Sequence, residues 1–310
     1  MRSRGSTIPF ARHSDDRVAV VMITHNRRER TLESLDSLSN LPERPPIVVV
    51  DNGSEDGTCL AMSQRFPAVT LIRSKNNLGA VARNLGVDRT RTPYVAFADD
   101  DVTWEPGCLS AAADAFDEHP QLGVLVAQVL VGRENIEDPI CRVLAESPLP
   151  RPPGMPGPSL LGFLGGASVV RRETFLTAGG YPKWAFIGGE EELLAAEIVA
   201  RGWWICYLPR LVAHHYPSPI RNTRLRDVYL RRNALWFKCL RRPLTVALRG
   251  VWELARDSLN DPVARQALLR SVVGLPAIAW RRRLLPADIE RQLAILENSR
   301  RLLAAEVASA

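Results

Sequence analysis

Short runs rich in β-branched residues alternate with helical patterns over the first 130 residues of this 310-residue chain, and this alternation restricts the fold most strongly. Each run has the length of a buried strand, and leucines recur between the first two runs with the spacing of a helix face. We expect an α/β fold with a mostly parallel, Rossmann-like central sheet and helices on both faces. The predicted strands cover residues 18–23, 47–50, 69–72, 94–98 and 124–131, and later strands cover residues 165–170 and 203–208.

Three parts follow one another along the chain. Residues 1–16 are polar and arginine-rich without the apolar core of a signal peptide, so we expect a flexible leader on a cytoplasmic protein. Residues 17–219 carry the strand–helix pattern, and residues 220–310 form a basic region that is helical to its end. Six prolines in residues 147–158 predict a loop, which either covers a bound acceptor or only connects two elements.

Positive charge is concentrated near the C-terminus. Residues 220–310 contain 18 Arg or Lys against 8 Asp or Glu, whereas the whole chain has a net charge of +6. Arginines flank Trp236, Phe237 and Trp280, which suits a helix lying on the inner face of a membrane; arginines in solvent on helices packed against the rest of the chain are the alternative. Nucleic acid is not an expected partner, because aromatic residues do not interleave with the basic ones. No apolar run is long enough to span a membrane.

Polar residues stand where three of the predicted strands end. The first strand is followed by Thr24, His25 and Asn26, the second by residues 51–54 and the fourth by residues 99–101. Ligands of parallel sheets bind at the carboxyl ends of the strands, so we expect these segments to surround one ligand site. A plain Asn-Gly turn at residues 52–53 is the alternative for the second segment.

The third segment is an uninterrupted triplet, Asp99, Asp100 and Asp101. A hard divalent cation such as Mg²⁺ or Mn²⁺ would neutralise these carboxylates and complete its coordination with substrate phosphates. Asp99 and Asp101 would point the same way if the segment were extended. A solvated acidic turn or a helix N-cap is the alternative.

These segments, with others, resemble the ordered motifs of glycosyltransferase family 2 over about residues 17 to 240. The motifs are Val21-Met22-Ile23-Thr24-His25-Asn26-Arg27, Val48-Val49-Val50-Asp51-Asn52-Gly53-Ser54, Asn77-Leu78-Gly79 with Arg83-Asn84, Phe97-Ala98-Asp99-Asp100-Asp101, Gly165-Gly166-Ala167, Gly179-Gly180-Tyr181-Pro182, and Gly189-Glu190-Glu191 with Gly202-Trp203. The resemblance implies a GT-A fold, a nucleotide-diphosphate sugar donor, a divalent metal (Mn²⁺ or Mg²⁺) and inversion at the anomeric carbon. The acceptor, whether glycan, lipid-linked or small molecule, is not specified by it.

By the same resemblance, Asp51 would contact the nucleobase and Arg83 would lie near the base or ribose. Asp99 would face the ribose or the metal, Asp101 would bind the metal directly, and His214 would approach the metal or the diphosphate. A histidine that only hydrogen-bonds locally is the alternative for His214. The full donor-binding set expected is Thr24, His25, Asn26, Asp51, Asn77, Arg83, Asp99 and Asp100.

The general base of an inverting transfer would come from the acidic cluster of residues 190–192. Counting back from Gly202-Trp203 in the family pattern assigns this role to Glu191, with Glu190 beside it. A shift of one residue would select Glu190 or Glu192 instead, and Glu192 could otherwise face the acceptor. Trp184, just before the cluster, would stack on an acceptor sugar or belong to the core.

Two other functions share parts of this pattern. A sugar nucleotidyltransferase usually has a glycine-rich basic loop after its first strand, whereas residues 24–28 contain no glycine. A non-catalytic scaffold derived from the fold would not need the aspartate triplet or the acidic cluster. The sequence therefore favours a metal-dependent glycosyltransferase.

Overall fold

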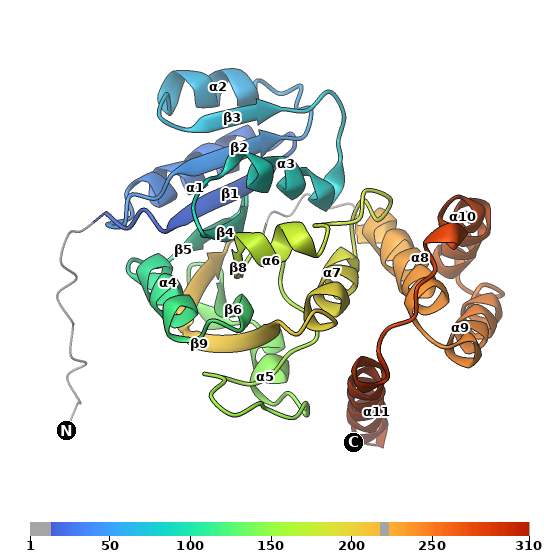
Figure 1. Ribbon diagram of the computed structural model, residues 1–310. Coiled ribbons are helices and arrows are strands. Elements are labelled where there is room, and N and C mark those ends of the chain that lie inside the picture. The colour runs from blue at the N-terminus through green and yellow to red at the C-terminus, as the bar shows by residue number, and fades with distance from the viewer. Residues whose placement is uncertain (1–13, 218–222, 310) are drawn as a thin grey trace.

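The computed structural model describes residues 14–217 and 223–309, and in these residues nine strands form one sheet (Figure 1). Its order is β3-β2-β1-β4-β8-β6-β9-β5, with β7 paired to β6. The strands are β1 (Val18–Thr24), β2 (Ile47–Asp51), β3 (Thr70–Arg73), β4 (Tyr94–Asp99), β5 (Val102–Trp104), β6 (Leu122–Val131), β7 (Ile136–Glu137), β8 (Ser168–Arg171) and β9 (Trp204–His215).

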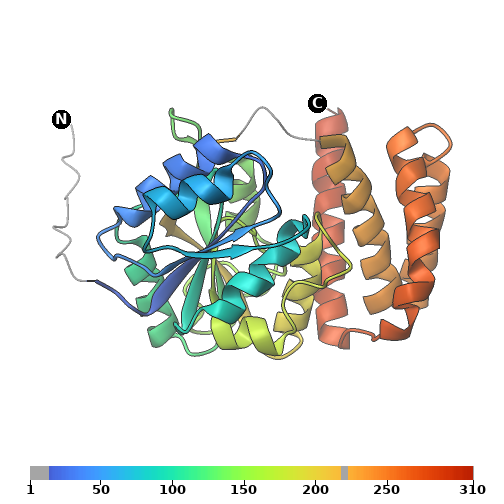
Figure 2. The same ribbon diagram turned by 90° about the horizontal axis from the view of Figure 1, so that it is seen from above.

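Parallel pairing dominates this sheet. Strands β1 to β4 pair in parallel, as do β6 and β9, whereas β8 and β5 run antiparallel to their neighbours. The expected α/β fold is therefore confirmed. The valines of β1 and β2 are almost completely buried because helices cover both faces, with α1 on one side and α3 on the other (Figures 1 and 2).

Eleven α-helices and two short 3₁₀ helices lie in the described residues. They are α1 (Arg28–Ser39), α2 (Thr58–Arg65), η1 (Gly79–Val81), α3 (Ala82–Arg89), α4 (Cys108–Glu118), α5 (Pro139–Ala145), α6 (Arg172–Thr177), α7 (Glu190–Val199), α8 (Thr223–Arg241), α9 (Leu244–Asp257), α10 (Pro262–Ile278), η2 (Ala279–Arg281) and α11 (Ala287–Ser309). No helix in this part of the chain is both long and apolar enough to cross a membrane.

The sequence pattern failed at several places in the sheet and at one helix. It placed the end of β9 at residue 208, but the strand continues to His215, because residues 209–211 bulge out of register between the pairs Ala127–Leu208 and Gln128–Val212. It also missed β5, β7 and α5, which are too short to show a period.

The C-terminal helices pack against the α/β part of the chain. Helices α8, α9 and α10 form a layer beside it, and Phe237 of α8 joins Leu193 and Ala196 of α7 in one apolar cluster (Figure 2). Helix α11 packs with Ile289 against Leu149 of the proline-rich segment, and its Leu293 also borders the cluster of Phe237. That segment is irregular, as predicted, and with α11 and β9 it lines a cavity of about 300 Å³.

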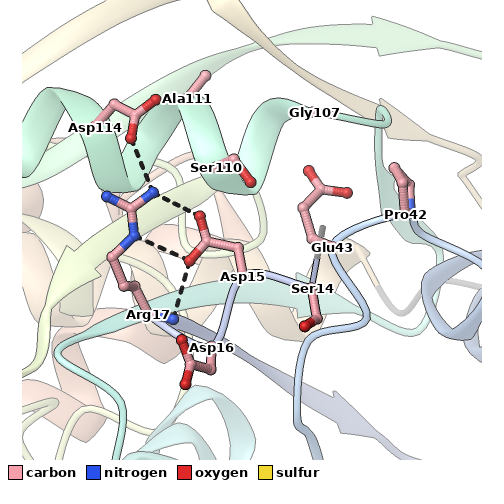
Figure 3. A pocket seen from close by; sticks show the side chains of 10 residues that line it. All are labelled: Ser14, Asp15, Asp16, Arg17, Pro42, Glu43, Gly107, Ser110, Ala111 and Asp114. Carbon is pink, nitrogen blue, oxygen red and sulfur yellow. Dashed lines mark hydrogen bonds and ion pairs between the residues drawn. The ribbon is translucent and has the colours of Figure 1, made fainter. Parts of the chain in front are cut away.

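Arg17 fixes the amino-terminal end of β1 to α4. Its guanidinium lies 2.6 Å from an Asp15 oxygen, 2.8 Å from Asp114 and 2.5 Å from Asp117 (Figure 3 draws the first two partners). The bond to Arg17 holds the pKa of Asp15 below its usual value. A cavity of about 530 Å³ beside this network lies at the amino ends of the strands and includes none of the expected site residues. Most of the expected leader, residues 1–13, lies outside the described residues.

Candidate active site

Three strands end side by side at the carboxyl edge of the sheet. Thr24 of β1 is the register partner of Asp51 of β2, and Ile23 of β1 is the partner of Asp99 of β4. The polar segments that follow these strands therefore meet around one place, which is the candidate active site.

Asp51 is fully buried and is not fully satisfied. Its Oδ1 accepts a hydrogen bond from the Ser54 backbone N–H at 3.2 Å, while Oδ2 has no hydrogen-bond partner among the described residues and lies 3.9 Å from Arg73 Nε. A buried carboxylate oxygen without a hydrogen bond is costly, so it has a strong tendency to accept an N–H from a bound ligand.

Residues 25, 26 and 77 shape the loops around this aspartate. His25 Nδ1 donates to the Asn52 carbonyl at 3.0 Å, and Asn26, with φ of 53°, accepts from the Glu55 N–H through its side chain. Asn77 is exposed and accepts from the Gly79 N–H at 2.8 Å. Asn52, which the sequence did not single out, binds the same loop through both ends of its amide, at Leu78 N and Gly79 O.

The aspartate triplet is divided between the surface and the interior. Asp99 ends β4 with 41% of its side chain exposed, whereas Asp100 and Asp101 occupy the turn before β5 and are buried. The extended segment on which the common direction of Asp99 and Asp101 depended is not present, because residues 100 and 101 form a turn. Arg27 Nη1 contacts Asp100 Oδ1 at 2.9 Å and Asp101 Oδ2 at 3.1 Å, a role that the sequence did not reveal.

Thr24 and Ser34 form hydrogen bonds to Asp100, the middle residue of the triplet. Thr24 Oγ1 donates to Asp100 Oδ2 at 3.0 Å, and Ser34 Oγ donates to the Asp100 backbone carbonyl at 2.8 Å. Burial raises the pKa of Asp100 to about 6, although Arg27 opposes the shift. These contacts hold Asp100 in place, and with it the backbone that carries its two neighbours, Asp99 and Asp101.

His215, and not His214, faces the triplet. His215 Nε2 lies 3.7 Å from Asp101 Oδ1, while His214 Nε2 lies 3.0 Å from Glu105 Oε1 and its Nδ1 3.0 Å from Asn135 Oδ1. Successive side chains of a strand point to opposite faces, and the pairing of Val102 with His215 directs the second histidine toward Asp101. His214 thus has the local role that we had considered as its alternative.

Asp101 and His215 have the donor chemistry of a Mn²⁺ or Mg²⁺ site. Among the described residues no group of three or more His, Cys, Asp or Glu side chains could hold a metal ion unaided. A carboxylate and an imidazole would fit an ion whose remaining ligands are diphosphate oxygens and water.

Arg83 joins the donor side of the site to the acidic cluster of α7. The guanidinium is 3% exposed, contacts Asp99 Oδ1 and lies against the rings of Phe97 and Tyr181. Asp99, Glu190 and Glu191 all raise the pKa of Arg83 against the opposing effect of burial. The buried guanidinium of Arg83 therefore interacts electrostatically with all three carboxylates.

Gly165 and Gly166 allow these carboxylates to approach. A Cβ on Gly165 would lie 2.6 Å from Glu191 Oε1, and a Cβ on Gly166 would lie 2.7 Å from Asp99 Oδ2. Any other residue would displace a carboxylate, which gives a physical reason for the glycine pair.

Glu190 and Glu191 differ in access although they are adjacent. Glu190 is buried, its Oε2 has no hydrogen-bond partner among the described residues, and burial with the neighbouring Glu191 raises its pKa to about 8. Glu191 is partly exposed, and desolvation raises its pKa as well, opposed by Arg83. Of the two residues, only Glu191 keeps appreciable exposed surface.

The two residues expected at the acceptor face other partners. Glu192 lies 3.8 Å from Arg300 of α11. Trp184 packs edge-on against Trp236 with ring centroids 5.5 Å apart and joins two apolar clusters with α8, as expected of a core residue.

Comparisons with known proteins identify the family of this chain. Residues 19–177 match the glycosyl transferase family 2 profile. An N-acetylglucosaminyl-diphospho-decaprenol L-rhamnosyltransferase of Mycobacterium tuberculosis is 29% identical over 235 residues, covering 64% of this chain and 76% of the relative. An uncharacterized glycosyltransferase of Bacillus subtilis is 36% identical over 92 residues, covering 28% of this chain and 23% of the relative.

Two solved structures share the fold. A mannosyltransferase from Pyrobaculum calidifontis in complex with GDP-Man and Mn²⁺ superposes with a TM-score of 0.56 at 20% identity, covering 94% of this chain and 81% of its own. The structure of GalNAc-T7 with UDP, GalNAc and Mn²⁺ gives a TM-score of 0.52 at 15% identity, covering 72% and 50%. At these identities the likeness concerns the fold alone, and it is the GT-A fold.

Proposed function

Because this chain belongs to glycosyltransferase family 2, we propose that it is a metal-dependent, inverting glycosyltransferase that uses a nucleotide-diphosphate sugar. The grouping of Asp99, Glu190 and Glu191 around the buried Arg83, beside the unsatisfied Asp51, carries this proposal. It combines a carboxylate for a nucleobase N–H with a second carboxylate, Glu191, whose pKa is raised by desolvation, as suits a general base. Family membership also favours glycosyl transfer over the nucleotidyltransferase and scaffold alternatives.

In the proposed mechanism, Glu191 takes the proton of the acceptor hydroxyl. The hydroxyl oxygen bonds to the anomeric carbon from the side opposite the diphosphate, and the bond from that carbon to the diphosphate oxygen breaks. Asp51 holds the base, with His25, Asn26 and Asn77 shaping the pocket. Arg83 keeps Asp99 and Glu191 at their places.

Asp101 and His215 would hold Mn²⁺ or Mg²⁺, with Asp99 at the exposed edge of the same site. His215 replaces His214 in this proposal because it is the histidine beside Asp101. The metal, when bound, supplies Lewis-acid stabilisation of the departing nucleoside diphosphate.

We propose that the acceptor substrate belongs to the class of lipid-linked sugar diphosphates. The Mycobacterium tuberculosis relative carries such an acceptor, N-acetylglucosaminyl-diphospho-decaprenol, in its name. The test is transfer of radiolabelled sugar from a panel of nucleotide sugars to that lipid and to free N-acetylglucosamine. Label on the lipid with inversion at the anomeric carbon supports the proposal, and label on free sugar alone contradicts the acceptor class.

We also propose that exposed apolar side chains of α9 and α10 face the membrane that would hold a lipid-linked acceptor. Leu248 and Trp252 of α9 are 59% and 61% exposed, and Val272 and Val273 of α10 are 64% and 81% exposed. Their helices also expose Arg249, Arg256 and Arg270, which would attract anionic headgroups.

We expect the double substitution Trp252→Asp with Val273→Asp to lower binding to phosphatidylglycerol vesicles at least about tenfold, since it removes two apolar side chains that would be buried in the membrane surface and adds charge repulsion. Vesicle co-sedimentation measures the bound fraction. The control pair Leu60→Asp with Ile136→Asp changes residues of similar exposure, 63% and 65%, in the α/β part of the chain. Equal binding by both double variants would remove this surface from the proposal.

A further inference from the structure

Residues 184–189 lead directly into α7 and therefore into Glu190 and Glu191; we call them the base loop. Phe186 has φ of 66°, and Gly188 and Gly189 have φ of 83° and 82°. A left-handed backbone is unfavourable at a phenylalanine, so local preference does not favour this conformation. Contacts from elsewhere must hold the loop.

Asn233 of α8 supplies most of those contacts. Its Nδ2 lies 2.9 Å from the Ala185 carbonyl, 3.3 Å from that of Ile187 and 2.6 Å from that of Gly188. The side chain is 1% exposed, so these carbonyls have little access to water there. One amide thus satisfies the backbone over the turn that precedes the acidic cluster.

Arg232 completes the attachment at the start of the loop. Its Nη2 donates to the carbonyls of Trp184 at 3.1 Å and Ala185 at 2.7 Å, and its Nε donates to Asn233 Oδ1 at 3.0 Å. The ring centroids of Tyr229 and Trp236 lie 4.5 and 4.2 Å from the guanidinium carbon of Arg232.

Burial of the positive charge of Arg232 costs free energy, because the guanidinium loses its hydration. The residue is 8% exposed, and no carboxylate in the described part of the chain forms an ion pair with it. Burial lowers its pKa to about 10. A guanidinium that contributed only to packing would be better replaced by an apolar side chain, whereas its fixed fork can bond several loop carbonyls at once.

The base loop is also bound from the donor side. The Ala80 N–H of η1 donates to the Phe186 carbonyl at 2.8 Å, and a Cβ on Gly79 would lie 2.2 Å from that same oxygen. Helix η1 runs directly into α3, which carries Arg83. The loop is therefore held between α8 and the element that positions the guanidinium beside Asp99 and Glu191.

We propose that Arg232 and Asn233 are positioning residues for transfer, because they fix the base loop and through it the Glu191 carboxylate relative to the bound donor. The inference rests on the proposed role of Glu191. It makes α8 part of the catalytic unit, so the helical C-terminal region would be required for turnover as well as for any contact with a membrane.

The test compares Asn233→Leu and Asn233→Asp with Leu235→Ala. Asn233→Asp keeps the shape and the acceptor for Arg232 but loses both donors to the loop. Leu235→Ala opens a cavity on the same helix, where Leu235 packs in the cluster with α9 and α10. We expect both Asn233 variants to lower kcat about 100-fold, as a misplaced catalytic group does, with the affinity for the nucleoside diphosphate that the protein binds (UDP, GDP, dTDP or CDP) changed less than about threefold.

Hydrogen exchange of the residue 185–191 amides gives a second readout, and it should speed up in the Asn233 variants but not in Leu235→Ala. Unchanged kcat and unchanged exchange in folded Asn233→Asp would overturn the inference. If Asn233→Leu does not fold, Arg232→Lys, which keeps the charge but loses the fork, provides the matching comparison. Full activity of Glu191→Gln would instead remove Glu191 from the proposed mechanism on which this inference rests, so the two failures are distinguishable.

Discussion

Glu191→Gln should lower kcat by about 10²–10⁴-fold, because an amide of the same size cannot take the acceptor proton. Donor affinity should change little, since the substitution keeps the shape of the side chain and leaves Asp51 and Arg83 in place. Steady-state transfer and calorimetric binding of the nucleoside diphosphate measure the two quantities separately.

Glu190→Gln and Glu192→Gln are matched controls for this result. Glu192 lies toward Arg300, so its variant should keep nearly full activity. Glu190 is buried and its pKa is about 8, so it is already mostly protonated at neutral pH, and Glu190→Gln should retain more activity than Glu191→Gln. A large loss for Glu190→Gln alone, with Glu191→Gln active, would transfer the role of base to Glu190.

Arg83→Met should destabilise the protein by about 3–5 kcal/mol, because it leaves Asp99 and two glutamates without their buried cation. The loss of positive charge should also raise the pKa of Glu190 and Glu191 further, so the rising limb of the pH–rate profile should move to higher pH. Chemical denaturation and a pH series of transfer rates measure the two effects. Arg30→Met removes an exposed pair with Glu33, so it should cost at most about 1 kcal/mol.

The direction of the pH effect on stability follows from Glu190. Its folded-state pKa of about 8 lies above the ordinary value of 4.5, so the folded protein binds more protons than the unfolded chain between these two values. The stability that Glu190 contributes is complete below pH 4.5 and is lost as the pH rises through 8. Arg83→Met should extend this loss to higher pH, and an unchanged pH range of the loss in the variant would contradict the electrostatic role of Arg83.

The sequence predicted those parts of the fold that follow from local pattern. The valine-rich runs at residues 18–23 and 47–50 predicted β1 and β2 to within one residue, because strands that are buried on both faces have continuous apolar sequences. The end of β9 was misplaced because a bulge at residues 209–211 looks like a strand end in the sequence. That error also concealed the alternation by which His215, and not His214, faces Asp101.

Tertiary contacts supply what the sequence left out of the site. Nothing in the spacing of Arg27 shows that it bridges Asp100 and Asp101, because the two segments are more than 70 residues apart. The same is true of Asn233, whose partners in the base loop lie 45 to 48 residues before it. The family motifs identified the strand ends and the acidic cluster, but the residues that hold them in place became visible only in three dimensions.

Metal-dependent binding of one nucleoside diphosphate tests the central claim most directly. UDP, GDP, dTDP and CDP are compared by thermal shift with and without Mn²⁺, in the parent protein and in Asp101→Asn. We expect one nucleotide at about 100 times its Kd to add roughly 2.7 kcal/mol of stability in the presence of Mn²⁺, and the metal-dependent part to vanish in the variant. If none of the four nucleotides stabilised the protein in the presence of Mn²⁺, this result would contradict the proposed donor site.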